Sequence, residues 1–467
     1  MNDENFKSNL TSIEKVSIYD ATYEQLHSFR FLTSLGNNQH HQIMKTQKKI
    51  NDLNLKAFEK SFEILIRRHE SLRSCFQINN EEIKLCIIPY DKDIFNVHYY
   101  EVNEVNFISF ISNRLEECEH SLLKIDSPPL LKCLIFNVYH RESFIWILMH
   151  HIISDEWSLR LILHEIEKYY DSFKNDRSIE IVPLKMQISE YSLHQKNWMA
   201  KNKDKIHDYW FSKLEPILNQ NKSFYQTQSI TYKSQEDLLN VLDNTKAFLC
   251  NSYIESNLYD SLVAVTSEYK ISMCTLIITS LQMLFFILFE KDKILMPMPI
   301  INRQFPGTKE LIGCFMGGIY MFHPLKQELS YKNFTKEVFN DFLNSCRYPI
   351  LDHKEMSLDE VILRLQSDVY LNFIKKTEEK LNISKSYIAN EHTDGHDPIF
   401  YALACITIEY ENGILLNWKY NPDIFSPNLI NSIIAIHGEI LYNISRNYET
   451  DIRTIIDNVR KYSQIKH

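Results

Sequence analysis

A near-continuous apolar run at residues 143–149 constrains the fold more than any other feature of this chain. The run reads SFIWILM and ends at two adjacent histidines, His150 and His151. Such a run is typical of a strand that is buried on both faces in an α/β protein. A polar loop follows at residues 154–156, and apolar residues then recur at helical spacing until about Phe173. This order of strand, polar hinge and helix predicts an α/β unit with the histidines at the end of its strand.

The rest of the chain repeats this alternation in two halves. Residues 55–76 predict an amphipathic helix that runs into a strand, and further strands are expected at 83–88 and 131–139. The charged segment 177–185 separates this half from a helical region at about 186–215. The second half predicts helices at 256–269, 273–289 and 427–446, and strands at 293–300, 314–323, 400–410 and 413–420. We therefore expect two α/β lobes, residues 1–180 and residues 181–467.

Composition narrows the class of protein. The 467 residues are 44% hydrophobic and 24% charged, which is typical of a folded globular chain. The net charge of −9 argues against nucleic acid or an anionic membrane as the main partner. The apolar stretch 273–289 contains Thr275, Thr279, Ser280 and Gln282, so we expect a buried core helix there and no membrane span. The polar, acidic start and the nine dispersed cysteines, without a C-x-x-C pair, predict a cytoplasmic protein with reduced thiols.

The two histidines admit three interpretations on residues alone. Neighbouring residues of a strand point to opposite faces, so one histidine can enter a cleft while the other supports it from behind. Asp155 lies four residues after His151 and can fix the loop. The pattern fits a catalytic site, or a core histidine pair with Asp155 as a helix cap. A metal site lacks a third and fourth ligand nearby, and the segment 392–397, HTDGHD, favours a solvated loop with an Asp-Gly turn.

The segment 149–158, MHHIISDEWS, resembles the His-His-x-x-x-Asp-Gly motif of nonribosomal peptide synthetase condensation domains. Other segments resemble further motifs of that family in the same order along the chain: Arg68–Phe76, Glu190–Trp198, Tyr209–Trp210, Asn302–Phe315 and Tyr420–Phe425. The likeness covers nearly the whole chain. The departures include Glu156 in place of the motif's glycine and Met316-Gly317 in place of Val-Asn. Because His150 is not an aspartate, the heterocyclising relatives are disfavoured.

This resemblance implies a fold of two chloramphenicol-acetyltransferase-like lobes in a V around a central tunnel. It implies an acyltransferase in which an acceptor amine attacks an acyl thioester, forming an amide or an ester bond. The thioester is presented on the 4'-phosphopantetheine arm of an acyl- or peptidyl-carrier protein, and the acceptor is a small molecule or is tethered to a carrier. We expect no cofactor bound by the chain itself, and a monomer. The end at His467 leaves no room for an adenylation or carrier domain, which predicts a free-standing enzyme or an excised domain.

The resemblance also assigns the two histidines and their aspartate. It implies that His151 accepts a proton from the attacking amine or positions that amine, and that His150 supports the loop. Asp155 then points away from the tunnel and pairs with an arginine. Arg303 is the first candidate for this partner and Arg73 is the second.

Three further residues of the motif complete the predicted site. The main-chain N–H of Glu156 is expected near the developing oxyanion, with Trp157 and Ser158 in the same oxyanion or acceptor region. A glutamate in place of glycine places negative charge there, which keeps an inactive recruiting domain open as an alternative. A coenzyme A-dependent acyltransferase of the same superfamily is the other alternative.

Overall fold

The computed structural model describes residues 16–34, 43–79, 82–102, 107–138, 142–218, 241–242, 245–350, 353, 358, 360–376, 392–398 and 400–465. Contacts within the chain divide it into two units. The first comprises Met1–Asp204 and Ile301–Gly317, and the second comprises Lys205–Ile300 and Gly318–His467. This division differs from the boundary predicted near residue 180, because the chain returns to the first unit at residues 301–317.

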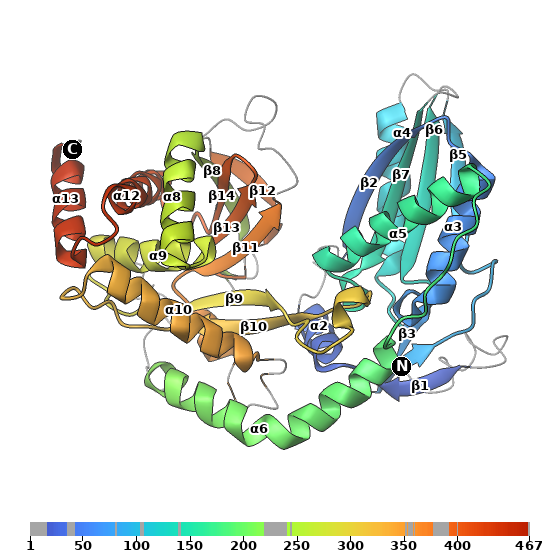
Figure 1. The fold of residues 1–467 in the computed structure, drawn as a ribbon, viewed down its shortest axis with the longest axis horizontal. Coiled ribbons are helices and arrows are strands. Elements are labelled where there is room, and N and C mark those ends of the chain that lie inside the picture. The colour runs from blue at the N-terminus through green and yellow to red at the C-terminus, as the bar shows by residue number, and fades with distance from the viewer. Residues whose placement is uncertain are drawn as a thin grey trace. The chain divides into compact units, whose positions relative to one another are not determined.

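The first unit is built on a four-stranded sheet with the order β2-β7-β6-β5. The strands are β2 (Ile43–Asn51), β5 (Val97–Val102), β6 (Leu131–Val138) and β7 (Glu142–His150). Helices α3 (Leu55–Arg68) and α5 (Glu156–Lys174) cover one face, and α4 (Phe107–Leu122) covers the other (Figure 1). Ile147 and Leu148 of β7 belong to the cores on opposite faces of the sheet. The prediction that the apolar run is a strand buried on both faces is confirmed.

A smaller three-stranded sheet, in the order β1-β4-β3, completes the first unit. Its strands are β1 (Ser17–Asp20), β3 (Ser74–Asn79) and β4 (Glu82–Ile87). The predicted helix that runs into a strand is α3, followed by the short 3₁₀ helix η2 (Glu70–Arg73) and β3. Helix α2 (Tyr23–Ser34) also lies in this unit, and α6 (Ile188–Leu218) begins in it.

The second unit contains a five-stranded sheet in the order β11-β13-β14-β8-β12. Its strands are β8 (Lys246–Ile254), β11 (Tyr370–Lys376), β12 (His392–Pro398), β13 (Leu403–Tyr410) and β14 (Gly413–Tyr420). Its helices after α6 are α8 (Ser256–Tyr269), α9 (Met273–Phe289), α10 (Tyr331–Arg347), α11 (Glu360–Gln366), α12 (Pro427–Arg446) and α13 (Ile452–Ile465). The prediction of a solvated loop at 392–397 is wrong, because the backbone of this segment pairs with β8 as an antiparallel strand.

Helix α9 is the core helix that its composition predicted. Residues 275–285 are all buried, and α8, α10, α12 and α13 contact it. Among the described helices, none is long and apolar enough alone to cross a membrane; α8 and α9 satisfy the criteria only together, with a bend of 109° between them.

Strands β9 (Met296–Ile301) and β10 (Met316–Met321) form a two-stranded sheet. The chain between them includes the 3₁₀ helix η5 (Thr308–Glu310) and belongs to the first unit. This excursion brings residues 301–317 to the loop that carries the histidines.

Candidate active site

The loop between β7 and α5 carries the predicted site. Strand β7 ends at His150, a 3₁₀ turn η3 spans His151–Ile153, and helix α5 begins at Glu156. Asp155 caps this helix, because its side chain accepts a hydrogen bond from the N–H of Ser158. The predicted order of strand, polar hinge and helix is therefore confirmed.

His150 lies behind the loop and is fully buried. Its Nδ1 accepts a hydrogen bond from the N–H of Ile152 at 3.0 Å, which fixes the start of the 3₁₀ turn. Burial, with a further contribution from the adjacent His151, lowers the pKa of His150 to about 3. The ring is neutral near pH 7, and it supports the backbone that presents His151.

His151 is the more accessible of the two histidines. Its side chain is partly exposed, in contrast to that of His150. Its Nδ1 lies 3.9 Å from the Sγ of Cys314, a buried residue of the 301–317 segment. Cys314 was not predicted as a site residue, although it lies within the Asn302–Phe315 segment that resembles a family motif.

Asp155 is held by a buried ion pair with Arg303. The Nη2 of Arg303 lies 2.8 Å from Oδ1 and 2.9 Å from Oδ2 of the carboxylate. The same carboxylate accepts bonds from the N–H and the hydroxyl of Ser158, both at 2.7 Å, and from the N–H of Phe315 at 3.3 Å. Asp155 is thus the anchor of the loop, and its contacts are those of a structural group.

The guanidinium of Arg303 connects this anchor to the 301–317 segment. Its Nη1 donates to the main-chain carbonyls of Thr308 and Leu311, both at 2.6 Å. The Cζ atom of this guanidinium lies 4.0 Å from the centre of the Phe315 ring. Burial lowers the pKa of Arg303, while the charge of Asp155 acts to raise it.

Arg73, the second candidate for the partner of Asp155, lies elsewhere. Its Nε donates to the carbonyl of Ile66 at 3.1 Å, and its Nη1 donates to that of Ile88. These contacts tie the end of α3 to the residue after β4. The expectation that Arg73 takes part in the active loop is wrong, because Arg303 is the arginine that pairs with Asp155.

Ser158 lies in the anchor and is fully buried. Its Oγ accepts the N–H of Gly313 at 3.0 Å and lies 3.0 Å from the carbonyl of the same residue. A Cβ at position 313 would approach the Phe315 ring to 2.8 Å and Ile188 to 3.2 Å. A side chain at position 313 would therefore force the Phe315 ring or the main chain to shift where the segment crosses the loop. The place of Ser158 in the oxyanion or acceptor region stays a prediction, and the contacts observed for Ser158 hold the loop together.

Glu156 and Trp157 occupy the first turn of α5. The side chain of Glu156 is 46% exposed, and a carboxylate oxygen lies 3.8 Å from the Nε of Arg160. A carboxylate at this end of a helix is also favoured by the helix dipole. The indole N–H of Trp157 donates to the carbonyl of Lys309 at 2.9 Å, which ties α5 to η5.

A buried carboxylate near the site was not predicted. Glu24 of α2 is fully buried, and burial raises its pKa. It accepts bonds from the Tyr191 hydroxyl at 2.9 Å, from Asn302 at 3.0 Å and from Gln195 at 2.6 Å. Because Asn302 precedes Arg303, this network secures α2, α6 and the 301–317 segment next to the anchor of the loop.

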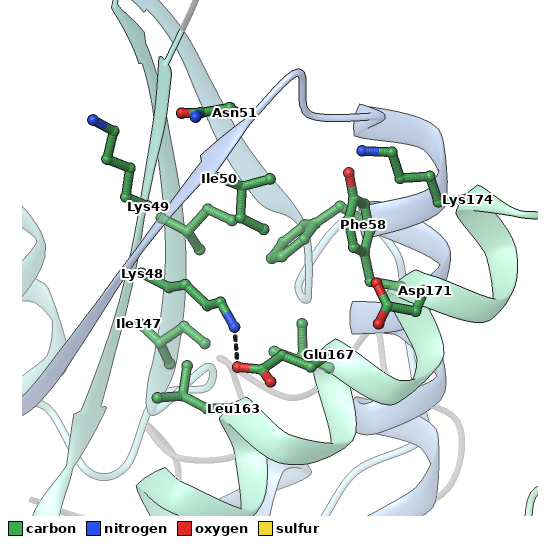
Figure 2. A pocket seen from close by; sticks show the side chains of 13 residues that line it. Lys48, Lys49, Ile50, Asn51, Phe58, Ile147, Leu163, Glu167, Asp171 and Lys174 are labelled. Atoms are coloured by element: carbon green, nitrogen blue, oxygen red, sulfur yellow. Dashed lines mark hydrogen bonds and ion pairs between the residues drawn. The ribbon is translucent and has the colours of Figure 1, made fainter. Parts of the chain in front are cut away.

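A separate cavity of about 370 Å³ lies between β2, β7, α3 and α5. Figure 2 shows the side chain of Lys48 on β2 reaching toward Glu167 on α5, with which it forms an ion pair. The lining of the cavity also includes the apolar side chains of Ile50, Phe58 and Ile147. None of the predicted site residues lines this cavity.

Comparisons with known proteins place this geometry in a family. The family model of the condensation domain matches residues 20–459. A linear gramicidin synthase protein of Brevibacillus parabrevis is 22% identical over 417 residues, 82% of this chain and 7% of that protein. Bacitracin synthase 2 of Bacillus licheniformis is 24% identical over 379 residues, 79% of this chain and 13% of that protein. The chain thus spans only a small part of the curated relatives that it matches.

Solved structures agree on the fold. A four-domain nonribosomal peptide synthetase bound to AMP and glycine aligns with a TM-score of 0.70 at 14% identity, over 94% of this chain and 34% of that one. The condensation domain of the monacolin K polyketide synthase aligns with a TM-score of 0.69 at 12% identity, over 93% of this chain and 99% of that one. The predicted fold class, two chloramphenicol-acetyltransferase-like α/β lobes, is confirmed.

Proposed function

The chain belongs to the condensation domain family, and from this we propose that it condenses an acceptor amine with a carrier-bound acyl thioester. The observation that carries the proposal is the placement of His151. It lies at the end of a buried strand, is partly exposed, and follows a buried histidine whose lowered pKa keeps it neutral. A neutral supporting ring leaves His151 as the proton-accepting group of the pair.

The proposed step needs little from the protein beyond positioning and one proton transfer. The neutral amine attacks the thioester carbonyl, the C–N bond forms, and the C–S bond breaks. The ammonium proton passes to the Nε2 of His151 and from there to the departing thiolate. Histidine suits this role because its side chain gains and loses protons near neutral pH, and orientation of the amine supplies a large part of the acceleration.

The proposal assigns the partner and the group it carries. The donor is an acyl- or peptidyl-carrier protein with a 4'-phosphopantetheine arm, and the chain itself binds no further cofactor. The acceptor is a small amine or one tethered to a second carrier. The anchor formed by Asp155, Arg303 and Ser158 keeps the His151 loop rigid, which supports a role in orientation.

The test is detection of a condensation product by intact mass. The purified chain is mixed with octanoyl-loaded and phenylalanyl-loaded carrier proteins and with a panel of free and carrier-tethered amines, with the matching acyl-coenzyme A donors in parallel. We expect an amide whose formation depends on the carrier-bound donor and is lost in His151→Ala. Equal use of acyl-coenzyme A across the panel would assign a coenzyme A-dependent acyltransferase. Carrier binding without transfer from any donor would assign a recruiting domain.

A further inference from the structure

The side chain of Cys314 faces the Nδ1 of His151, and the proposed reaction does not by itself use this contact. The two atoms lie 3.9 Å apart, and Cys314 is only 1% exposed. The N–H of Met316 also bonds to this sulfur, and burial holds the pKa of the thiol far above its ordinary value. Cys314 is therefore a neutral thiol that is shielded from solvent, and its chemistry is that of a hydrogen-bonding group.

The main chain on both sides of Cys314 is held by hydrogen bonds. Gly313 bonds to the hydroxyl of Ser158, and the N–H of Phe315 bonds to Asp155. Ser158 and Asp155 follow His151 within the same loop and the first turn of α5. The main chain that carries Cys314 is thus held against the same anchor that caps the His151 loop, which places the two side chains next to each other.

We propose that the sulfur of Cys314 accepts the Nδ1–H of His151 and so keeps the Nε2 of that ring unprotonated. The inference rests on the proposed function, in which Nε2 takes the proton of the amine. A neutral imidazole carries one hydrogen, and the bond made by one ring nitrogen decides which nitrogen bears it. Thiol sulfur is a weak acceptor, so the bond favours the Nδ1–H tautomer by a small free energy. Cys314 is a positioning residue that acts through His151.

The tautomer is measured directly in the full chain labelled with ¹⁵N-histidine. The ¹⁵N chemical shifts show which ring nitrogen carries the hydrogen, and the signal of His151 is identified by its loss in His151→Ala. We expect the Nδ1–H form in the wild type and in Cys314→Ser, whose hydroxyl also accepts. Cys314→Ala should increase the Nε2–H form. Cys133→Ala is the matched control, because Cys133 is a buried cysteine of the same unit on β6, and it should leave the tautomer unchanged.

Kinetics give the second readout. Loss of one hydrogen bond should lower kcat of Cys314→Ala by about three- to tenfold, with KM unchanged, while Cys314→Ser retains kcat within about twofold. The Nε2–H form in the wild type, or an unchanged tautomer in Cys314→Ala, would overturn the inference. Because the spectrum needs no substrate, the expected tautomers in a chain that forms no amide would support the role of Cys314 and refute the proposed function alone.

Discussion

The guanidinium of Arg303 reaches both carboxylate oxygens of Asp155 through one nitrogen, although the two residues are separated by 148 positions. Their side chains are each only 5% exposed. The bond joins the His151 loop to a segment from the middle of the second half of the chain. It explains how a short polar loop at the end of a strand keeps one conformation.

Removal of either partner of this pair should cost stability. Asp155→Ala or Arg303→Ala leaves a buried charge unmatched, so the free energy of unfolding should fall by about 3–5 kcal/mol. The control is Glu63→Ala, which breaks the exposed Glu63–Arg67 pair on α3 and should cost no more than about 0.5 kcal/mol. Urea denaturation measures both. An Asp155→Ala protein of normal stability that has lost all activity would make the carboxylate catalytic.

Replacement of His151 should abolish condensation and leave the fold intact. His151→Ala removes the proposed proton acceptor, so the rate of amide formation should fall by about 10²–10⁴-fold. His150→Ala should cause a smaller kinetic loss together with lower stability, because the His150 ring is buried and caps the 3₁₀ turn. Single-turnover assays and melting curves separate the two effects. Activity within about threefold of wild type in His151→Ala would exclude the proton-transfer role of this residue.

The close approach at Gly313 predicts a steric effect. Gly313→Ala places a Cβ 2.8 Å from the Phe315 ring, and such overpacking typically costs about 1–3 kcal/mol. Gly438 on α12 is the matched control, since a Cβ there meets nothing within 4 Å. Gly438→Ala should stabilise the protein by about 0.5–1 kcal/mol because alanine favours a helix interior. Equal effects of the two substitutions on the melting temperature would contradict this account.

The buried His150 predicts acid sensitivity. Its pKa of about 3 in the folded chain lies below the ordinary value of 6.5, so the unfolded chain binds its proton more readily. The contribution of neutral His150 to the free energy of unfolding is present above pH 6.5 and is lost as the pH falls toward 3. Between pH 6.5 and 5 the free energy of unfolding should fall by about 2 kcal/mol from this group. His150→Asn keeps an acceptor for the Ile152 N–H but cannot be protonated. Its melting temperature should therefore fall less on acidification, and an unchanged pH dependence would refute the assignment.

Glu156 offers a test of acceptor choice. If its half-exposed carboxylate attracts the distal ammonium of a diamine, Glu156→Gln should raise KM for putrescine by about two- to fivefold, with little change for a neutral amine. Glu63→Gln removes an exposed carboxylate on α3, so it controls for overall charge. Equal changes in KM for both amines would show that Glu156 does not bind the acceptor. Its role would then be confined to the start of α5 and the contact with Arg160.

Local pattern predicted the parts of the site that are contiguous in the chain. The apolar run and the helical spacing after Trp157 identified β7 and α5 with a polar hinge between them, because burial and periodicity are encoded over a few residues. The 3₁₀ turn η3 within that hinge was not predicted. Arg303 was reached only through the family resemblance. The contact of Cys314 with His151 and the network around Glu24 join distant segments, and no local periodicity records such contacts. The same reason explains why the return of residues 301–317 to the first unit went unpredicted.

That return has a consequence for recombination between related condensation domains. A crossover at a single position near residue 204 would supply His151 and Asp155 from one parent but Arg303, Gly313 and Cys314 from the other. Each bond between the His151 loop and the 301–317 segment would then join residues from two different parents. Chimeras should therefore inherit 1–204 and 301–317 as one cassette, exchanged at three junctions instead of one. The residues that must be inherited together to keep this site therefore come from two separate stretches of the gene.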